Sequence, residues 1–141
     1  MKKYVLDANA LLDLVEAGPG FQKVEHLFQT AIQQHSSILI SVLNWGEVFS
    51  LLWQRRGEET VRRTRAGLSR LPLEIVSVDI AQAMTAGELK AVHKVPYVDG
   101  ISAALAVLQQ ATLVTSWTAT SKSSDVTFRF CGSRVPDFTT G

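Results

Sequence analysis

The sequence has very little cysteine and no long apolar run. Its one cysteine, Cys131, has no second cysteine to pair with, which excludes a small secreted scaffold held together by disulfides. No stretch approaches the run of about 18 apolar residues that suggests a membrane span. The start at Met1-Lys2-Lys3 resembles a signal peptide, but Asp7 interrupts the apolar run that follows it. We therefore expect a cytoplasmic protein.

An excess of charge is also lacking, and so are the motifs of several common ligand sites. The formal net charge is +1, from 14 Lys and Arg against 13 Asp and Glu, which gives no strong nonspecific attraction to nucleic acid. No glycine-rich loop follows a strand candidate, which argues against P-loop and dinucleotide-binding folds. The three histidines, at positions 26, 35 and 93, lack the spacing of a zinc site.

The chain has enough apolar residues for a hydrophobic core, and its length suits one domain. With 46% hydrophobic and 19% charged residues, general disorder is excluded. At 141 residues the chain has about the usual size of a single domain, so we expect one domain over 1–141. The composition changes after Thr115, because seven of the ten residues at 115–124 are Ser or Thr. We therefore treat 116–141 as an atypical C-terminal segment.

Short, unalternating apolar runs alternate with helical patterns along the chain. Such runs favour a parallel sheet that is covered on both faces. We therefore predict an α/β fold, a three-layer α/β/α sandwich with a central parallel sheet. Asn44 and Asp79 are the expected N-caps of two of its helices. The expected strands are 4–6, 37–41, 73–78 and 111–115, and the expected helices are 8–16, 21–35, one after Asn44, 58–70, one from Asp79 through Leu89, and 97–110.

Three acids stand out because each lies beside apolar sequence. Asp7 ends the first expected strand, and open parallel sheets place ligand sites at the carboxyl ends of their strands. Glu47 and Asp99 lie near the starts of two expected helices, where one interpretation is that they only complement the helix dipole. The other interpretation is a shared site, because desolvated carboxylates need a cation or hydrogen bonds to stay ionised. Carboxylates plus water suit Mg²⁺ or Mn²⁺.

Ordered motifs in the chain resemble the PIN-domain family. The first is Tyr4-Val5-Leu6-Asp7-Ala8-Asn9-Ala10-Leu11-Leu12, which is similar to the family's opening strand with its Asp, small residue and Ser, Thr or Asn. The second is Asn44-Trp45-Gly46-Glu47-Val48, in which Glu47 is similar to the family's second acid.

Two further motifs follow in the family's order. The segment 98–106 is similar to its Asp-x-x-x-Ala-Ala-x-Ala helix, with Asp99 as the third acid. Leu113-Val114-Thr115 is similar to the strand that normally leads into Gly-Asp or a similar pair. The resemblance covers roughly residues 3–117, and length and architecture are most similar to the VapC toxins of bacterial and archaeal toxin–antitoxin pairs.

This resemblance implies a metal-dependent endoribonuclease, the toxin component of a type II toxin–antitoxin pair, that hydrolyses RNA phosphodiester bonds. Asp7, Glu47 and Asp99 would be both the catalytic residues and the ligands of Mg²⁺ or Mn²⁺. Asn9 would support them by bonding a ligating carboxylate or a water, although a turn or cap role suits it equally. The implied partners are an RNA substrate, a cognate antitoxin and a second copy in a homodimer. Apolar side chains that offer material for the dimer contact are Trp45, Phe49, Leu52 and Trp53.

The family's fourth acid is missing from its expected place one or two residues after Thr115. The chain has Ser116 and Trp117 there, and the next carboxylate is Asp125. Three outcomes stay open: Thr115 or Ser116 supports a three-acid site, Asp125 folds back, or the site is impaired. The alternative function is therefore a PIN-fold binding module with impaired or lost nuclease activity.

Six arginines gather in one polar stretch of the chain. One interpretation is a phosphate-contacting surface. The other is a solvated helix face with intrahelical ion pairs, since Glu58 and Glu59 lie among them. The arginines are Arg55, Arg56, Arg62, Arg63, Arg65 and Arg70.

Overall fold

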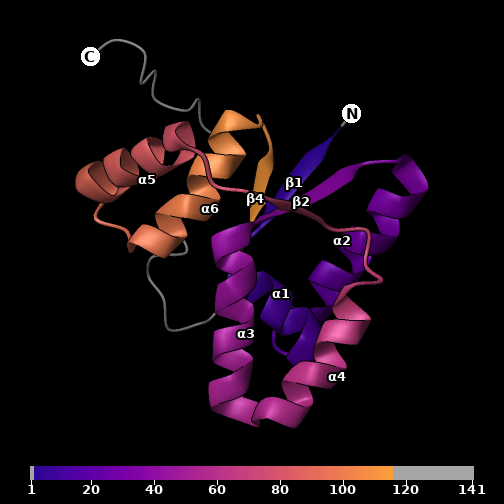
Figure 1. Cartoon of the computed structure of the whole chain (residues 1–141). Coiled ribbons are helices and arrows are strands. Elements are labelled where there is room, and N and C mark those ends of the chain that lie inside the picture. The colour runs from indigo at the N-terminus through magenta and orange to yellow at the C-terminus, as the bar shows by residue number, and fades with distance from the viewer. Residues whose placement is uncertain (1, 116–141) are drawn as a thin grey trace.

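The computed structural model describes residues 2–115, and within them helices cover both faces of a parallel sheet (Figure 1). The strand order of this sheet is β3-β2-β1-β4, and every neighbouring pair is parallel. The predicted α/β/α arrangement is thus confirmed. The strands are β1 (Lys3–Leu6), β2 (Ser37–Ser41), β3 (Glu74–Val76) and β4 (Thr112–Val114), and the helices are α1 (Ala8–Glu16), α2 (Phe21–Gln34), α3 (Val42–Arg56), α4 (Glu58–Leu68), α5 (Ile80–His93) and α6 (Tyr97–Leu108).

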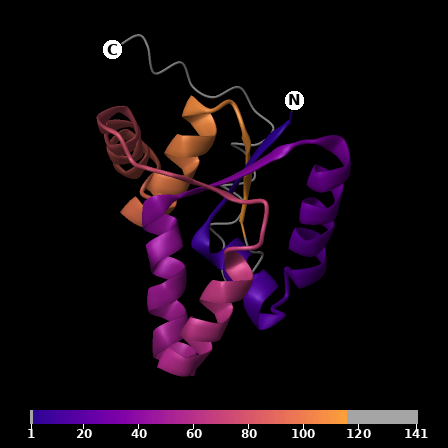
Figure 2. The same cartoon turned by 45° about the vertical axis from the view of Figure 1, so that its right-hand side comes forward.

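Side chains alternate along the central strands and build two apolar clusters. Val5 and Leu39 pack with residues of α5 and α6 in one cluster. Leu6 and Ile40 pack with residues of α1, α2, α3 and α4 in the other. Figure 2 shows α5 and α6 on one side of the sheet and α2 on the other. Because both faces of β1 and β2 are buried near their carboxyl ends, these two strands are continuous apolar runs there in the sequence.

Most element positions follow the sequence prediction, and the differences lie at the ends. The third strand covers only Glu74–Val76 where 73–78 was expected, because three register pairs join it to β2. Gly57 separates α3 from α4 with a φ of 84°, a backbone conformation that favours glycine. Asp79 caps α5 as predicted, since its Oδ1 accepts a hydrogen bond from the backbone N of Gln82 at 2.8 Å.

The prediction that Asn44 caps α3 is wrong. The helix begins at Val42, and the residue before it, Ser41, is extended with a φ of −66° and a ψ of 142°. Ser41 is also the last residue of β2, so strand passes into helix without a loop. Asn44 therefore lies within the first turn of α3, and Glu47 lies in its second turn.

The loop between α1 and α2 closes around a carboxylate. Asp13 is buried, and its Oδ2 accepts a hydrogen bond from the backbone N of Gly20 at 3.1 Å. A Cβ atom at Gly18 or at Gly20 would collide with a carboxylate oxygen of Asp13. The glycines that end the first helical pattern in the sequence are thus required by this close approach.

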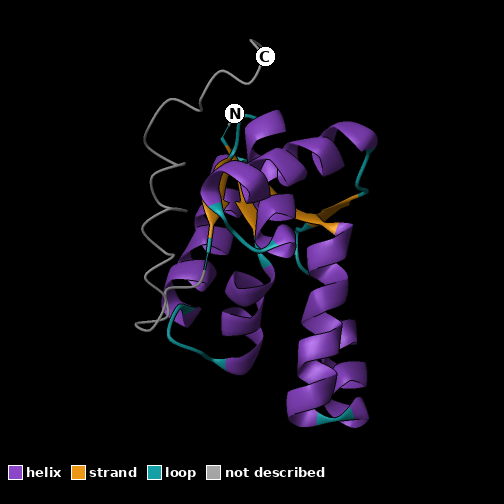
Figure 3. Ribbon diagram, turned by 90° about the vertical axis from the view of Figure 1, so that its left-hand side faces the viewer, coloured by secondary structure: helices purple, strands orange, loops and turns teal. Residues whose placement is uncertain are grey.

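Helices α3 and α4 run side by side and extend away from the sheet (Figure 3). No helix within residues 2–115 is long and apolar enough to cross a membrane. The predictions that concern Ser116, Trp117, Asp125 and the atypical segment 116–141 lie outside the described residues.

Candidate functional site

Asp7 lies at the carboxyl end of β1, in the middle of the sheet edge. Its Oδ1 accepts a hydrogen bond from the backbone N of Ala10 at 2.8 Å and so caps α1. Its own backbone N donates to the carbonyl oxygen of Val114 at 3.2 Å, which ties it to the end of β4. The sequence thus places this carboxylate by two backbone contacts, one along the chain and one across the sheet.

Burial raises the pKa of Asp7 from 3.8 to about 7. The hydrogen bond from Ala10 acts in the opposite direction, and the negative charges of Asp99, Glu47 and Asp13 raise the pKa further. A carboxyl that is 7% exposed and surrounded by other carboxylates gives up its proton near neutral pH. Such a perturbed acid, set among other acids, is typical of a functional site.

Glu47 and Asp99 approach Asp7 from two different helices. Partial burial raises the pKa of Glu47, and the charge of Asp99 raises it further. Asp99 lies in the first turn of α6 and is exposed, yet the protein around its carboxyl desolvates it enough to raise its pKa too. The three acids therefore run from the interior to solvent, with Asp7 buried, Glu47 half-buried and Asp99 exposed.

The interpretation that Glu47 and Asp99 only complement a helix dipole suits the position of one of them, Asp99. Asp99 does lie in the first turn of its helix. The first turn of α3 contains no acid, because that helix begins earlier than the sequence suggests and Glu47 falls in its second turn. A helix dipole acts mainly on the first and last turns, so it does not explain the position of Glu47.

Asn44 and Ser41 adjoin the acids, and the sequence reasoning missed both as site residues. The Nδ2 atom of Asn44 donates to the carbonyl oxygen of Val98 at 3.3 Å, which joins α3 to α6. Within residues 2–115, Asn44 Oδ1 and Ser41 Oγ are buried and have no hydrogen-bond partner. The signal in the sequence was the polar residues of Ser41-Val42-Leu43-Asn44, which lie in apolar surroundings just before Glu47.

The three supporting residues of the sequence prediction have different positions. Asn9 is exposed on the first turn of α1, two residues after Asp7. Thr115 follows β4, and because Leu6 pairs with Val114, it continues the strand beside Asp7. Ser116 lies beyond the last described residue. Asn9 and Thr115 thus remain predictions as supporting residues, and so does Ser116.

The oxygen atoms of the three acids and of the polar residues beside them are of the type that binds a hard divalent cation. They do not form a coordination shell in the described part of the chain. Among residues 2–115, no group of three or more His, Cys, Asp or Glu side chains is placed so as to hold a metal ion. Asp7, Glu47 and Asp99 are close enough for their negative charges to raise the pKa values of Asp7 and Glu47. Carboxylate oxygens with partnerless amide and hydroxyl oxygens beside them match the ligand preference of Mg²⁺ and Mn²⁺.

Four arginines of α3 and α4 form ion pairs with glutamates. Glu16 of α1 binds two of them, with Arg55 Nη1 at 2.8 Å from its Oε1 and Arg56 Nε at 3.1 Å from its Oε2. On α4 the intrahelical pairs expected from the sequence are present: Arg62–Glu58 at 2.7 Å and Arg63–Glu59 at 3.4 Å. The interpretation of a helix face with intrahelical ion pairs is thus confirmed for Arg62 and Arg63, whereas Arg55 and Arg56 pair with an acid of another helix.

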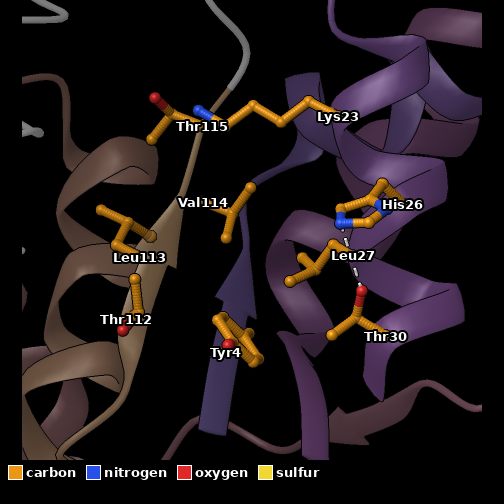
Figure 4. Close-up of a pocket in the computed structure, with 9 residues that line it drawn as sticks. All are labelled: Tyr4, Lys23, His26, Leu27, Thr30, Thr112, Leu113, Val114 and Thr115. Carbon is orange, nitrogen blue, oxygen red and sulfur yellow. Dashed lines mark hydrogen bonds between the residues drawn. The ribbon is translucent and has the colours of Figure 1, made fainter. Parts of the chain in front are cut away.

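A cavity of about 390 Å³ lies between β4 and α2. Figure 4 shows Lys23, His26 and Thr30 along its α2 wall, with the Lys23 side chain reaching toward Thr115 at the end of β4. The Nε2 atom of His26 lies 3.4 Å from Thr30 Oγ1. None of the described residues that line this cavity is an acid, so the carboxylate cluster lies elsewhere.

Fold and site together define a class, an α/β protein whose parallel sheet carries coupled carboxylates at its carboxyl edge. A model of the PIN domain matches residues 4–116. The chain therefore belongs to the PIN domain family. Comparison with curated proteins gives no match.

Solved structures share this fold at low sequence identity. VapC20 of Mycobacterium tuberculosis, described as a Sarcin-Ricin loop cleaving toxin, is 17% identical with a TM-score of 0.67 over 82% of this chain and 91% of that chain. DNA-bound VapBC from Salmonella typhimurium is 21% identical with a TM-score of 0.65 over 82% and 86% of the two chains. A toxin–antitoxin complex from Klebsiella pneumoniae is 24% identical with a TM-score of 0.62 over 82% and 88%. The chain is thus VapC-like in fold.

Proposed function

We propose that this chain is a metal-dependent endoribonuclease, the toxin component of a type II toxin–antitoxin pair, which hydrolyses RNA phosphodiester bonds in the cytoplasm. Membership of the PIN domain family supports this function, and so does a fold shared with a toxin described as cleaving the Sarcin-Ricin loop. The observation that carries the proposal is the electrostatic coupling of Asp7, Glu47 and Asp99, which come from three separate elements.

In this proposal Asp7, Glu47 and Asp99 hold Mg²⁺ or Mn²⁺ and are the catalytic residues. Bound there, the cation would polarise the phosphodiester and lower the pKa of an attacking water. Asp7 Oδ1 already accepts the hydrogen bond from Ala10 that caps α1, so we expect Asp7 Oδ2 to bind the cation. The pKa of about 7 means that cation binding displaces a proton from Asp7 near neutral pH. The exposed Asp99 leaves the solvent side of the site open to an RNA phosphate.

The backbone around Asp99 is held in place before any substrate arrives. Ser102 Oγ donates to the carbonyl oxygen of Asp99 at 3.0 Å, which closes the first turn of α6. Gly100 lies so close to α5 that a Cβ atom there would be 3.0 Å from the carbonyl oxygen of Ala86. Preorganised ligands of this kind reduce the cost of assembling the site.

We also propose a cognate antitoxin and a homodimer as partners. The antitoxin is supported by the similar structure from Klebsiella pneumoniae, which is described as a toxin–antitoxin complex. Of the four side chains considered for a dimer contact, Leu52 is fully buried and Trp53 is 54% exposed. Trp45 and Phe49 pack on the core and on each other, with ring centroids 5.0 Å apart. Sedimentation of a monomer at high micromolar concentration would remove the dimer from the proposal.

The decisive experiment compares two carboxylate-to-amide variants of the full chain. With Mn²⁺ and a structured RNA, we expect weak cleavage by the wild type, no cleavage by Asp99→Asn, and wild-type cleavage by Asp79→Asn. Asp79 is the matched control because it caps α5, a role that Asn also fills. EDTA should abolish the activity.

Two results would contradict the nuclease. Cleavage by Asp99→Asn at the wild-type rate, or in excess EDTA, would show that the acids are not the site. A folded wild type that binds Mn²⁺ and RNA without cleaving it would favour the alternative, a binding module of PIN fold.

A further inference from the structure

Two buried oxygen atoms close to the acids have no partner within the described part of the chain. Ser41 is 0% exposed and Asn44 is 1% exposed, and neither Ser41 Oγ nor Asn44 Oδ1 has a hydrogen-bond partner there. Buried polar groups are nearly always hydrogen-bonded, because an unpaired one keeps its full cost of desolvation. The two atoms therefore indicate a bound group that completes them.

Both residues lie on the elements that carry the acids. Leu6 pairs with Ile40 across β1 and β2, so Asp7 and Ser41 come next, side by side, at the edge of the sheet. Asn44 lies one turn before Glu47 on α3. Its Nδ2 bonds the carbonyl oxygen of Val98, whose next residue is Asp99. The two residues thus neighbour the three acids in the fold.

The chemistry of these atoms narrows the choice of ligand. An amide oxygen only accepts hydrogen bonds, and the Nδ2 atom of Asn44 already donates to α6. The missing partner must therefore be a hydrogen-bond donor or a cation, which excludes a direct contact with an anionic phosphate oxygen at this atom. Mg²⁺ and Mn²⁺ keep part of their hydration shell when carboxylates bind them, and such water donates hydrogen bonds.

We propose that Ser41 and Asn44 are positioning residues for the divalent cation, and that their free oxygens accept hydrogen bonds from its hydration water. This inference rests on the proposed function, because it needs the cation site of Asp7, Glu47 and Asp99. Asn44 then acts at both ends of its amide: Nδ2 holds α6 against α3, and Oδ1 orients water beside the carboxylates. Groups that orient metal ligands from outside the coordination shell commonly change metal affinity by about 10–100-fold.

The test measures Mn²⁺ binding by titration calorimetry, together with the melting temperature of the metal-free protein. We expect Ser41→Ala to weaken Mn²⁺ binding about 10-fold and to leave the metal-free melting temperature unchanged or raised, because the lost hydroxyl has no partner. Ser69→Ala is the control, since that hydroxyl is exposed and bonds only the end of α4. It should leave Mn²⁺ binding at the wild-type level.

Variants of Asn44 give an independent answer. Asn44→Leu removes the acceptor and should weaken Mn²⁺ binding at least as much as Ser41→Ala, whereas Asn44→Asp keeps an acceptor oxygen and adds a negative charge, so it should bind Mn²⁺ at least as tightly as the wild type. A merely structural role predicts the reverse pattern: a lower metal-free melting temperature for Ser41→Ala, and an unchanged Mn²⁺ dissociation constant in every variant. Asn44→Leu also removes the Nδ2 bond to Val98, so for this variant only the dissociation constant decides.

The outcomes separate this inference from the proposed function. If the wild type binds Mn²⁺ and cleaves RNA, while Ser41→Ala and Asn44→Leu bind Mn²⁺ within twofold of the wild type, only the inference fails. If the folded wild type binds no Mn²⁺ at millimolar concentration, the cation site of the proposed function fails and the inference fails with it.

Discussion

The Nδ2 atom of Asn44 lies 3.3 Å from the carbonyl oxygen of Val98 and joins two helix starts that are 54 positions apart in the chain. Glu47 is one turn beyond Asn44, and Asp99 follows Val98. This hydrogen bond therefore joins the two helix segments that carry two of the three acids. The asparagine that looks like a helix cap in the sequence lies inside the first turn of α3 instead, because β2 passes directly into this helix.

Asp7→Asn should stabilise the metal-free protein at alkaline pH. The pKa of Asp7 is about 7 in the folded protein against 3.8 for the free side chain, so the folded state binds more protons between these values. The free energy of unfolding therefore falls as pH rises through this interval. We expect the variant to exceed the wild type by about 2–4 kcal/mol at pH 8 and to match it near pH 4.

Urea unfolding of both proteins in EDTA, at pH 4, 6 and 8, measures this difference. Asn also caps helices, so the bond from Ala10 is retained in the variant. A difference that does not change with pH would contradict the raised pKa of Asp7.

Gly20→Ala should destabilise the protein by about 1–3 kcal/mol, because a Cβ atom there collides with a carboxylate oxygen of Asp13. The φ of Gly20 is −90°, which alanine also adopts, so the contact alone causes the loss. A double-mutant cycle with Asp13→Ala, followed by thermal unfolding, checks the cause. The two losses should not add, since the collision disappears with the carboxylate. Strict additivity would show that the contact is not the reason.

Glu16→Gln should cost more stability than Glu59→Gln. Glu16 binds Arg55 and Arg56 together, and its side chain is only 14% exposed. Glu59 holds a single, exposed arginine at 3.4 Å within α4. We expect a loss of about 1 kcal/mol for Glu16→Gln and less than about 0.5 kcal/mol for Glu59→Gln, with both losses smaller in 1 M salt. Equal losses in denaturant unfolding would show that the α1–α3 contact adds nothing beyond a surface ion pair.

Ser116→Asp should increase RNA cleavage over the wild type. It restores a carboxylate one residue after Thr115, where the family's fourth acid is expected, and added negative charge favours a second cation or the attacking water. Initial rates with matched circular dichroism spectra measure the effect, and Ser116→Asn is the uncharged control. A wild type that is already as active as the Ser116→Asp variant would direct attention to Asp125 as the fourth acid.

The sequence by itself determined the layers of this protein. The runs at β1 and β2 are apolar at every position that meets a core, and helical patterns separate all the strands, which is sufficient for a covered parallel sheet. Asp79 and Gly57 marked element ends correctly, because a cap and a positive φ depend on local geometry. Asp7 could be singled out because it directly follows a buried strand.

Only the tertiary structure decided which polar residues meet. The first turn of α3 starts straight from β2, so Ser41 and Asn44 became buried residues beside the acids, and no local pattern reports a bond to Val98. The pKa of Asp7 depends on burial by several elements and on charges that are 40 and 92 positions away along the chain at Glu47 and Asp99. Local sequence indicates where most helices and strands lie, but desolvation and the interaction between charges depend on distances that only the packing of α1, α3 and α6 against the sheet sets.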